Sequence, residues 1–145
     1  MLDHDYLGMR FDFSNPGKVM IDMQDYINEI LQHIPDDMEG VATTPAAEHL
    51  FKTRSDAEPL DAATAELFHI ITTQLLFLCN RGRPDVQMAV SFLCTRVTKP
   101  DIDNYKKLEQ VIKYLRKTKF MRLTLEADRS TRRHEESIWL FHDIQ

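Results

Sequence analysis

The chain has 145 residues, a net charge of −5 and 43% hydrophobic residues, which is enough apolar material for the core of one compact unit. Its longest apolar run, around residues 75–79, is far shorter than the roughly 20 residues of a membrane span, and no basic export signal opens the sequence. Cys79 and Cys94 lie in apolar stretches without metal-ligand spacing, which predicts free thiols in a reducing compartment. We therefore expect an intracellular protein, cytoplasmic or nuclear, with no membrane partner, no cofactor and no metal.

Charge is distributed unevenly along the chain. Residues 1–66 contain fourteen acidic and four basic side chains, whereas residues 67–145 contain fourteen basic and nine acidic ones. One half of the sequence is therefore acidic and the other basic.

The first predicted element is a β-hairpin within residues 1–21. Apolar and polar side chains alternate over residues 6–13, and an Asn-Pro-Gly turn at 15–17 precedes the apolar residues 19–21.

Residues 22–60 are predicted to form one helix and a surface connection. Asp22 can cap the helix, and Pro35 ends it. The prolines and charged residues that follow show no sustained period, which is typical of a connection. Asp36 and Asp37 are predicted to be solvated, because they lack the further oxygen ligands that a divalent cation requires. The apolar residues of the helix recur with the helical period and are Tyr26, Ile27, Ile30, Leu31 and Ile34.

Residues 61–119 are predicted to form three further helices. Asp61 can cap the first, whose apolar residues cover more than one stripe, as in a largely buried helix. Pro84 suits the first turn of the second, and Asp101 or Asp103 opens the third.

A short pair of strands, residues 121–125 and 137–141, is predicted near the end of the sequence. The predicted fold class is therefore α+β and mainly α, with an N-terminal hairpin, about four helices and this C-terminal strand pair.

No catalytic motif is apparent. The sequence has no glycine-rich phosphate loop, no His-Glu-X-X-His and no nucleophile beside a plausible base. The strongest chemical signal is a basic cluster in the last helix. Lys106, Lys113 and Lys117 fall on one side at about 100° per residue, with Arg116 at its border, and would attract a nucleic acid backbone. A solvated face with cations near a helix C-terminus explains the same cluster equally well.

The break between the second and third helices contains Arg83-Pro84-Asp85. Here the guanidinium of Arg83 can pair with the carboxylate of Asp85 and hold the turn, which favours a structural use over ligand contact.

Three ordered motifs carry a family resemblance. "FHIITTQLLFLC" at 68–79, "RPDVQMAV" at 83–90 and "KLEQVIKYLRKT" at 107–118 resemble, in order and spacing, the segment of copia-type retrotransposon polyproteins that follows the polymerase catalytic motif. "YLGM" at 6–9 is similar to a further block of that family, and the resemblance covers nearly all of residues 5–125.

The resemblance implies a role for each part of the chain. Residues 1–21 would be a primer-grip-like hairpin, with Leu7, Gly8 and Met9 at the grip, and residues 61–119 a thumb-like helical region. Residues 120–145 would be the truncated start of a ribonuclease-H-like region. Arg83, Pro84 and Asp85 would form a structural hinge between two thumb helices. Thr73 stands where the family has a small residue beside the template–primer duplex.

Two departures from the family pattern bear on activity. The Tyr-X-Asp-Asp block that binds the catalytic metal ions does not occur in the sequence, so we expect no polymerisation by this chain alone. Near the end, Asp143 falls one position late for the first ribonuclease H ligand.

Three hypotheses stay open at this stage. The first is a non-catalytic reverse transcriptase fragment that binds an RNA–DNA or DNA duplex non-specifically, alongside the rest of a retrotransposon polyprotein if the chain is longer. The second is a helical protein–protein interaction module, including self-association. The third is a functionless transposon relic.

Overall fold

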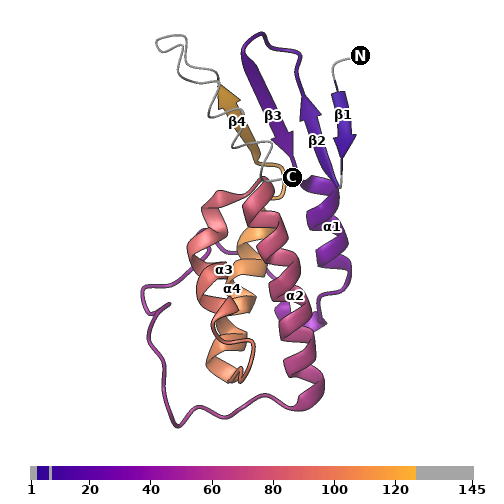
Figure 1. Ribbon diagram of the computed structural model, residues 1–145. Coiled ribbons are helices and arrows are strands. Elements are labelled where there is room, and N and C mark those ends of the chain that lie inside the picture. The colour runs from indigo at the N-terminus through magenta and orange to yellow at the C-terminus, as the bar shows by residue number, and fades with distance from the viewer. Residues whose placement is uncertain (1–2, 7, 127–145) are drawn as a thin grey trace.

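The computed structural model describes residues 3–6 and 8–126. Four antiparallel strands form one sheet at one end of the molecule, and the helices pack against and below it (Figure 1). The strands lie side by side in chain order and are β1 (Asp3–Tyr6), β2 (Met9–Asp12), β3 (Lys18–Asp22) and β4 (Arg122–Glu126). The predicted α+β class, with helices as the larger part, is confirmed.

The predicted hairpin is present as the pairing of β2 with β3. Phe11 lies opposite Ile21 in the antiparallel register, and both are buried. In the connecting turn, the N–H of Lys18 donates to the carbonyl of Asn15 at 3.1 Å. Gly17 has a φ of 75°, which glycine adopts without a steric penalty.

The alternating stretch at residues 6–13 is divided between β1 and β2, and the sequence did not indicate this division. The chain turns back after β1, so that Tyr6 pairs with Met9. Gly8 makes this turn possible because its φ is 78°, and a Cβ at this position would lie 3.3 Å from the ring of Tyr26. An alternating pattern does not reveal such a turn, because both arms keep the same period.

The predicted strand over residues 121–125 is confirmed as β4, whose described partner is β3. Leu123 lies opposite Ile21. The second predicted strand, residues 137–141, lies outside the described residues, as does Asp143. In this way the first and last described parts of the chain meet in one sheet.

The four predicted helices are present. They are α1 (Gln24–Gln32), α2 (Ala62–Arg81), α3 (Gln87–Cys94) and α4 (Ile102–Thr118), with two short 3₁₀ helices, η1 (Asp36–Met38) and η2 (Pro84–Val86). Two boundaries differ from the prediction. Met23 is the N-cap of α1, while the carboxylate of Asp22 accepts the Gln24 N–H at 2.7 Å. Pro84 opens η2, and α3 begins three residues later.

The core lies between the sheet and the helices. Ile27 and Ile30 of α1 are buried, as predicted from their period. The end of α2 approaches the sheet so closely that a Cβ on Gly82 would overlap the Met23 side chain, with Ile21 also in contact range. α2 is long and apolar enough to span a membrane, a property that the core helices of globular proteins share. Its fully buried side chains include Phe68, Leu75 and Leu78, among others.

Candidate nucleic-acid interface

α4 begins at a capping box. The carboxylate of Asp101 accepts the N–H of Asn104 at 2.9 Å, and the Asn104 side chain accepts the N–H of Asp101 at 3.0 Å. These two bonds satisfy amides that a helix start otherwise leaves without partners. Downstream, apolar residues at the helical period bury one face and leave the remaining surface to the charged residues; the buried apolar residues are Leu108, Val111, Ile112 and Leu115.

The four basic residues predicted for nucleic acid binding differ in their environments. Lys106 and Lys117 are exposed, whereas Lys113 and Arg116 are half-buried. Lys113 pairs with Glu109 one turn earlier, with Nζ 2.7 Å from the carboxylate. The structure therefore presents two exposed lysines on α4 and two cations that already have partners.

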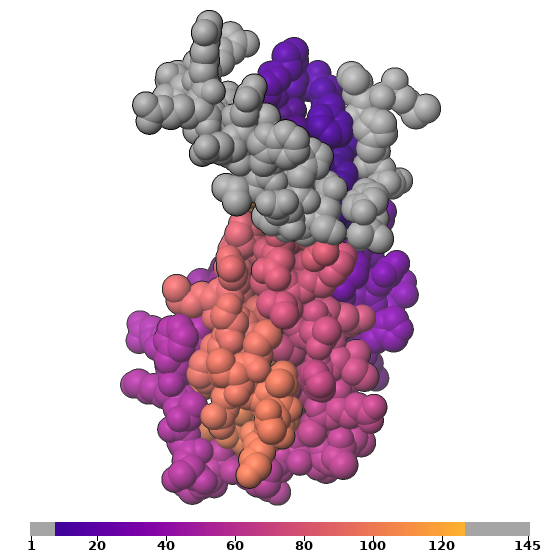
Figure 2. All heavy atoms as spheres, viewed as in Figure 1, coloured from indigo at the N-terminus to yellow at the C-terminus, as the bar shows by residue number. Residues whose placement is uncertain are grey.

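The partners of Arg116 come from the connection between α1 and α2. We call residues 36–60 the strap. One guanidinium nitrogen, Nη1, donates to the carbonyl oxygens of Met38 at 2.8 Å and Gly40 at 2.6 Å. Figure 2 shows part of the strap, in purple, along the flank of the orange α4. The connection predicted from the sequence is thus ordered against the basic helix.

The strap continues along α4 toward its N-terminus. The Gln110 side chain donates to the carbonyl of Thr44 at 2.9 Å, and Nζ of Lys107 donates to the carbonyl of Lys52 at 2.6 Å. Asp37, at the start of the strap, also contacts the first turn of α4, where the hydroxyl of Tyr105 donates to its carboxylate at 3.0 Å. Burial and this carboxylate raise the pKa of Tyr105 to about 12, so the hydroxyl stays protonated as a donor.

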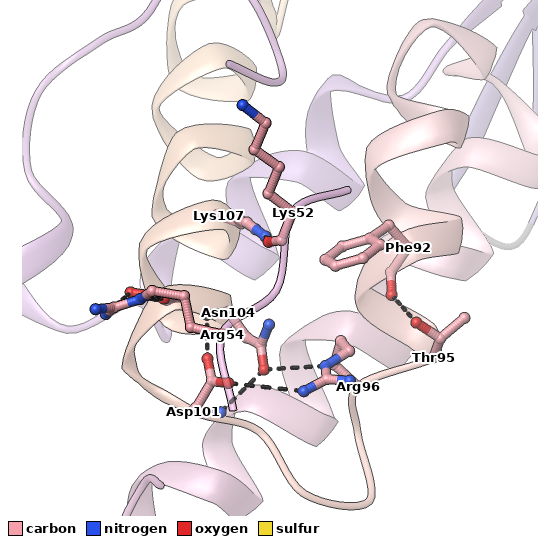
Figure 3. A network of polar contacts seen from close by, with 9 residues as sticks. Lys52, Arg54, Phe92, Thr95, Arg96, Asp101, Asn104 and Lys107 are labelled. Carbon is pink, nitrogen blue, oxygen red and sulfur yellow. Dashed lines mark hydrogen bonds and ion pairs between the residues drawn. The ribbon is translucent and has the colours of Figure 1, made fainter. Parts of the chain in front are cut away.

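A polar network holds the last part of the strap at the start of α4 (Figure 3). Arg54 donates to both carboxylate oxygens of Asp103, at 2.7 and 2.9 Å, and this bidentate contact holds the pKa of Asp103 below its usual value. Arg96 donates to the side-chain oxygen of Asn104 at 3.3 Å and lies 3.6 Å from the Asp101 carboxylate. These cations neutralise nearby carboxylates.

Lys107 is buried although it is charged. Its Nζ lies 4.5 Å from the centre of the Phe92 ring, in addition to its bond to the strap. Burial lowers the pKa of Lys107, and nearby Asp103 partly opposes this effect. Sequence reasoning left this residue out of the site. Its burial could have been predicted from the sequence, because Lys107 lies four residues before Val111 and therefore on the apolar side of the helix.

The predicted pair between Arg83 and Asp85 is present. The guanidinium donates to the two carboxylate oxygens at 3.0 and 2.8 Å. The same group donates to the carbonyl of Thr118 at 2.9 Å and to its hydroxyl at 2.7 Å. Arg83 is only 2% exposed, so one side chain joins the α2–α3 turn to the end of α4. Pro84 provides the first residue of η2.

Tyr114 completes this network. Its hydroxyl donates to the Asp85 carboxylate. Burial alone would raise the pKa of Asp85, but the hydrogen bonds from Arg83 and Tyr114 outweigh it and lower that pKa. Burial, with the carboxylate next, raises the pKa of Tyr114. Both groups therefore keep the charge states in which they bind each other near neutral pH.

Two of the three primer-grip-like positions, Gly8 and Met9, lie at the β1–β2 turn. Leu7 is outside the described residues. Gly8 makes the turn, and Met9 is buried in the core at 5% exposure. Thr73, the position expected beside a duplex, is exposed on α2, where its hydroxyl donates to the carbonyl of His69 at 2.9 Å.

The described part of the chain contains neither a group of metal ligands nor an activated thiol. No group of three His, Cys, Asp or Glu side chains there is placed to hold a metal ion. Cys79 and Cys94 are free thiols, and burial raises the pKa of Cys79 to about 11. A thiol with such a pKa is a poor nucleophile at neutral pH.

Similarity to a known protein places these features in context. The chain is 29% identical over 122 residues to a putative transposon Ty5-1 protein of Saccharomyces cerevisiae. The match covers 80% of this chain and 37% of the yeast protein, so the chain spans little more than a third of that relative's length. No protein-family profile and no solved structure matches the chain. The similarity shows that the chain is related to a retrotransposon protein.

Proposed function

We propose that the chain is a non-catalytic segment of a copia-type reverse transcriptase that binds a template–primer duplex, RNA–DNA or DNA, without sequence preference. The observation that carries the proposal is the placement of cations on α4, where Lys106 and Lys117 are exposed and Lys113 and Arg116 lie beside them. The similarity to a transposon protein supports the retrotransposon origin in this proposal.

The spacing of the two exposed lysines suits a phosphate backbone. They are eleven residues apart, so α4 separates them by about 16 Å, or about five base-pair steps of 3.4 Å. Long lysine side chains can reach phosphates at this separation without entering a groove. Contacts of this kind position a protein on a duplex but carry no sequence information.

Polymerisation is not part of the proposal. Two-metal phosphoryl transfer needs converging carboxylates, and the sequence has no Tyr-X-Asp-Asp block. Asp36 and Asp37 do not replace it, because Asp37 binds Tyr105 and no metal-binding group forms around it in the described residues. We propose the rest of a retrotransposon polyprotein as the partner that would supply the catalytic residues.

The test is fluorescence anisotropy with a labelled RNA–DNA duplex. Reversal of all four charges by Lys106→Glu, Lys113→Glu, Arg116→Glu and Lys117→Glu should abolish binding. The double variant K106E/K117E, which leaves the two partnered cations intact, should weaken it strongly. A matched control, K18E/K99E, makes the same change in net charge outside α4 and should bind almost as well as the parent chain. Equal losses in the two double variants would contradict the assigned surface.

A second candidate function is self-association. Three apolar side chains near the described edge strand β4 are well exposed, namely Phe120 at 65%, Met121 at 47% and Leu125 at 37%. Exposed apolar residues beside an open strand edge favour pairing between chains. Sedimentation velocity across micromolar concentrations tests this candidate, and a strict monomer throughout would exclude it.

A further inference from the structure

We infer that the strap is a displaceable cover over part of the phosphate-binding face of α4, and that duplex binding lifts residues 39–49 away from it. This inference rests on the proposed function and adds a form of regulation to the same site. It is carried by the contacts of Arg116 and Lys113, the charge of the strap and the distribution of its buried anchors.

The partners of Arg116 in the strap are weak compared with a phosphate. Both are neutral carbonyl oxygens, those of Met38 and Gly40. Hydrogen bonds between two ionised groups are shorter and stronger than bonds to a neutral acceptor, and a guanidinium binds phosphate through two parallel bonds. A phosphate can therefore replace the Gly40 carbonyl at Arg116 with a gain in interaction, while the bond to the Met38 carbonyl can remain.

Lys113 lies beneath the same turn of the strap. A Cβ on Gly40 would lie 3.8 Å from Cε of Lys113, and the N–H of Ala42 donates to the Lys113 carbonyl at 3.2 Å. The strap thus passes directly over two of the four proposed phosphate-binding residues. Lys106 and Lys117 are exposed.

The charges of the strap suit an intramolecular competitor. Residues 36–60 contain six acidic and two basic side chains, whereas α4 contains five basic and two acidic ones. A polyanion and the strap are therefore attracted to the same helix. Salt weakens both attractions, because much of this surface is exposed to solvent.

The anchors of the strap define the part that can move. Met38 is completely buried and Leu50 is 5% exposed, so both ends of the intervening segment are fixed in the core. Every residue from 39 to 49 is exposed or half-buried. A segment with few buried apolar contacts opens at a lower free energy than the core on either side.

The first experiment releases the strap without changing net charge. G40A places a side chain at a φ of 105°, and Q110A removes the donor to Thr44. In the G40A/Q110A variant, two more cations can reach phosphates. The slope of log affinity against log salt should steepen from about −2 to about −4, and affinity at 50 mM salt should rise about tenfold.

A matched control makes similar substitutions away from the strap. G17A also places a side chain at a positive φ, with nothing within 4 Å, and Q32A removes an exposed glutamine from α1. The G17A/Q32A chain should keep the parent affinity and slope. Parent-like affinity and slope in G40A/Q110A would overturn the inference and leave the proposed function standing. If neither the parent nor the released chain binds, the proposed function fails.

The second experiment uses the reciprocity of coupled equilibria. If strap closure opposes duplex binding, then duplex binding must oppose strap closure to the same degree. Amide hydrogen exchange of residues 39–49 should therefore become faster when the parent chain is saturated with RNA–DNA duplex, while exchange within α2 is unchanged. Slower or unchanged exchange of these residues in the complex would overturn the inference even if G40A/Q110A binds more tightly.

Discussion

Two arginines near the C-terminal end of α4 show opposite uses of the same side chain. Arg83 is buried and binds a carboxylate through two bonds, while its remaining donors bind Thr118. Arg116 is half-buried, and its hydrogen-bond acceptors among the described residues are carbonyl oxygens of the strap. The first arginine stabilises the fold, whereas the second has contacts that a phosphate can replace. The number of cations in a sequence is therefore no measure of the number available to a ligand.

The largest expected effect follows from the Arg83 network. Arg83→Met leaves the Thr118 carbonyl without its guanidinium donor and the Asp85 carboxylate without its cation, although the Tyr114 hydroxyl still donates to that carboxylate. We expect the free energy of unfolding to fall by about 3–5 kcal/mol. Urea denaturation followed by circular dichroism measures the change. Lys117→Met should stay within about 0.5 kcal/mol of the parent, as expected for an exposed position. A similar loss in the free energy of unfolding for Arg83→Met and Lys117→Met would contradict the distinction between structural and available cations.

Asp85→Asn should have a somewhat smaller effect, with a defined pH dependence. It weakens charge-assisted bonds and should cost about 1.5–3 kcal/mol at pH 7. Since the pKa of Asp85 is lowered in the folded chain, its contribution is complete above the unfolded value of about 3.9 and is lost as the pH falls through the folded pKa. Urea titrations should give a constant difference between pH 7 and 5 that shrinks below about pH 4. A difference that grows on acidification would contradict this sign.

Gly82→Ala tests the contact between the end of α2 and the sheet. The new methyl group would overlap the Met23 side chain, so we expect a loss of about 1–3 kcal/mol in the free energy of unfolding. Thermal denaturation compares this variant with Gly17→Ala, where the added group meets open space and the cost arises from the backbone alone. A smaller loss of stability for Gly82→Ala than for Gly17→Ala would show that the Met23 side chain moves aside at little cost.

The smallest expected change in stability sharpens the comparison between the two arginines. Arg116→Met removes bonds to two carbonyls, one of them exposed, and should cost about 0.5–1.5 kcal/mol. Urea denaturation beside Arg83→Met measures the contrast directly. A cost for Arg116→Met as large as that for Arg83→Met would mean that both residues are structural.

The helices were predictable from the sequence because their apolar residues recur at 3.6-residue intervals. Ile27 and Ile30 in α1 and Leu108 and Val111 in α4 follow this period, and all four are buried. The ion pair between Arg83 and Asp85 was also predictable, because opposite charges two residues apart can meet without knowledge of the rest of the fold.

The contacts of the strap could not be predicted in the same way. The acceptors for Arg116, Gln110 and Lys107 are backbone carbonyls, which every residue has and which leave no mark on the sequence. Their partners are more than fifty positions away along the chain. The turn at Gly8 was missed for a related reason, because one glycine in an alternating stretch does not show whether the chain reverses.

The most direct test of the proposed interface is lysine labelling with an acylating reagent, read out by mass spectrometry, with and without RNA–DNA duplex. In the free chain, Lys106 and Lys117 should react readily and Lys107 slowly, because Lys107 is buried. Saturating duplex should protect Lys106 and Lys117 while Lys18, on β3, stays reactive. Continued labelling of Lys106 and Lys117 in the complex, with protection elsewhere, would show that a duplex binds another surface and would contradict the assignment of α4.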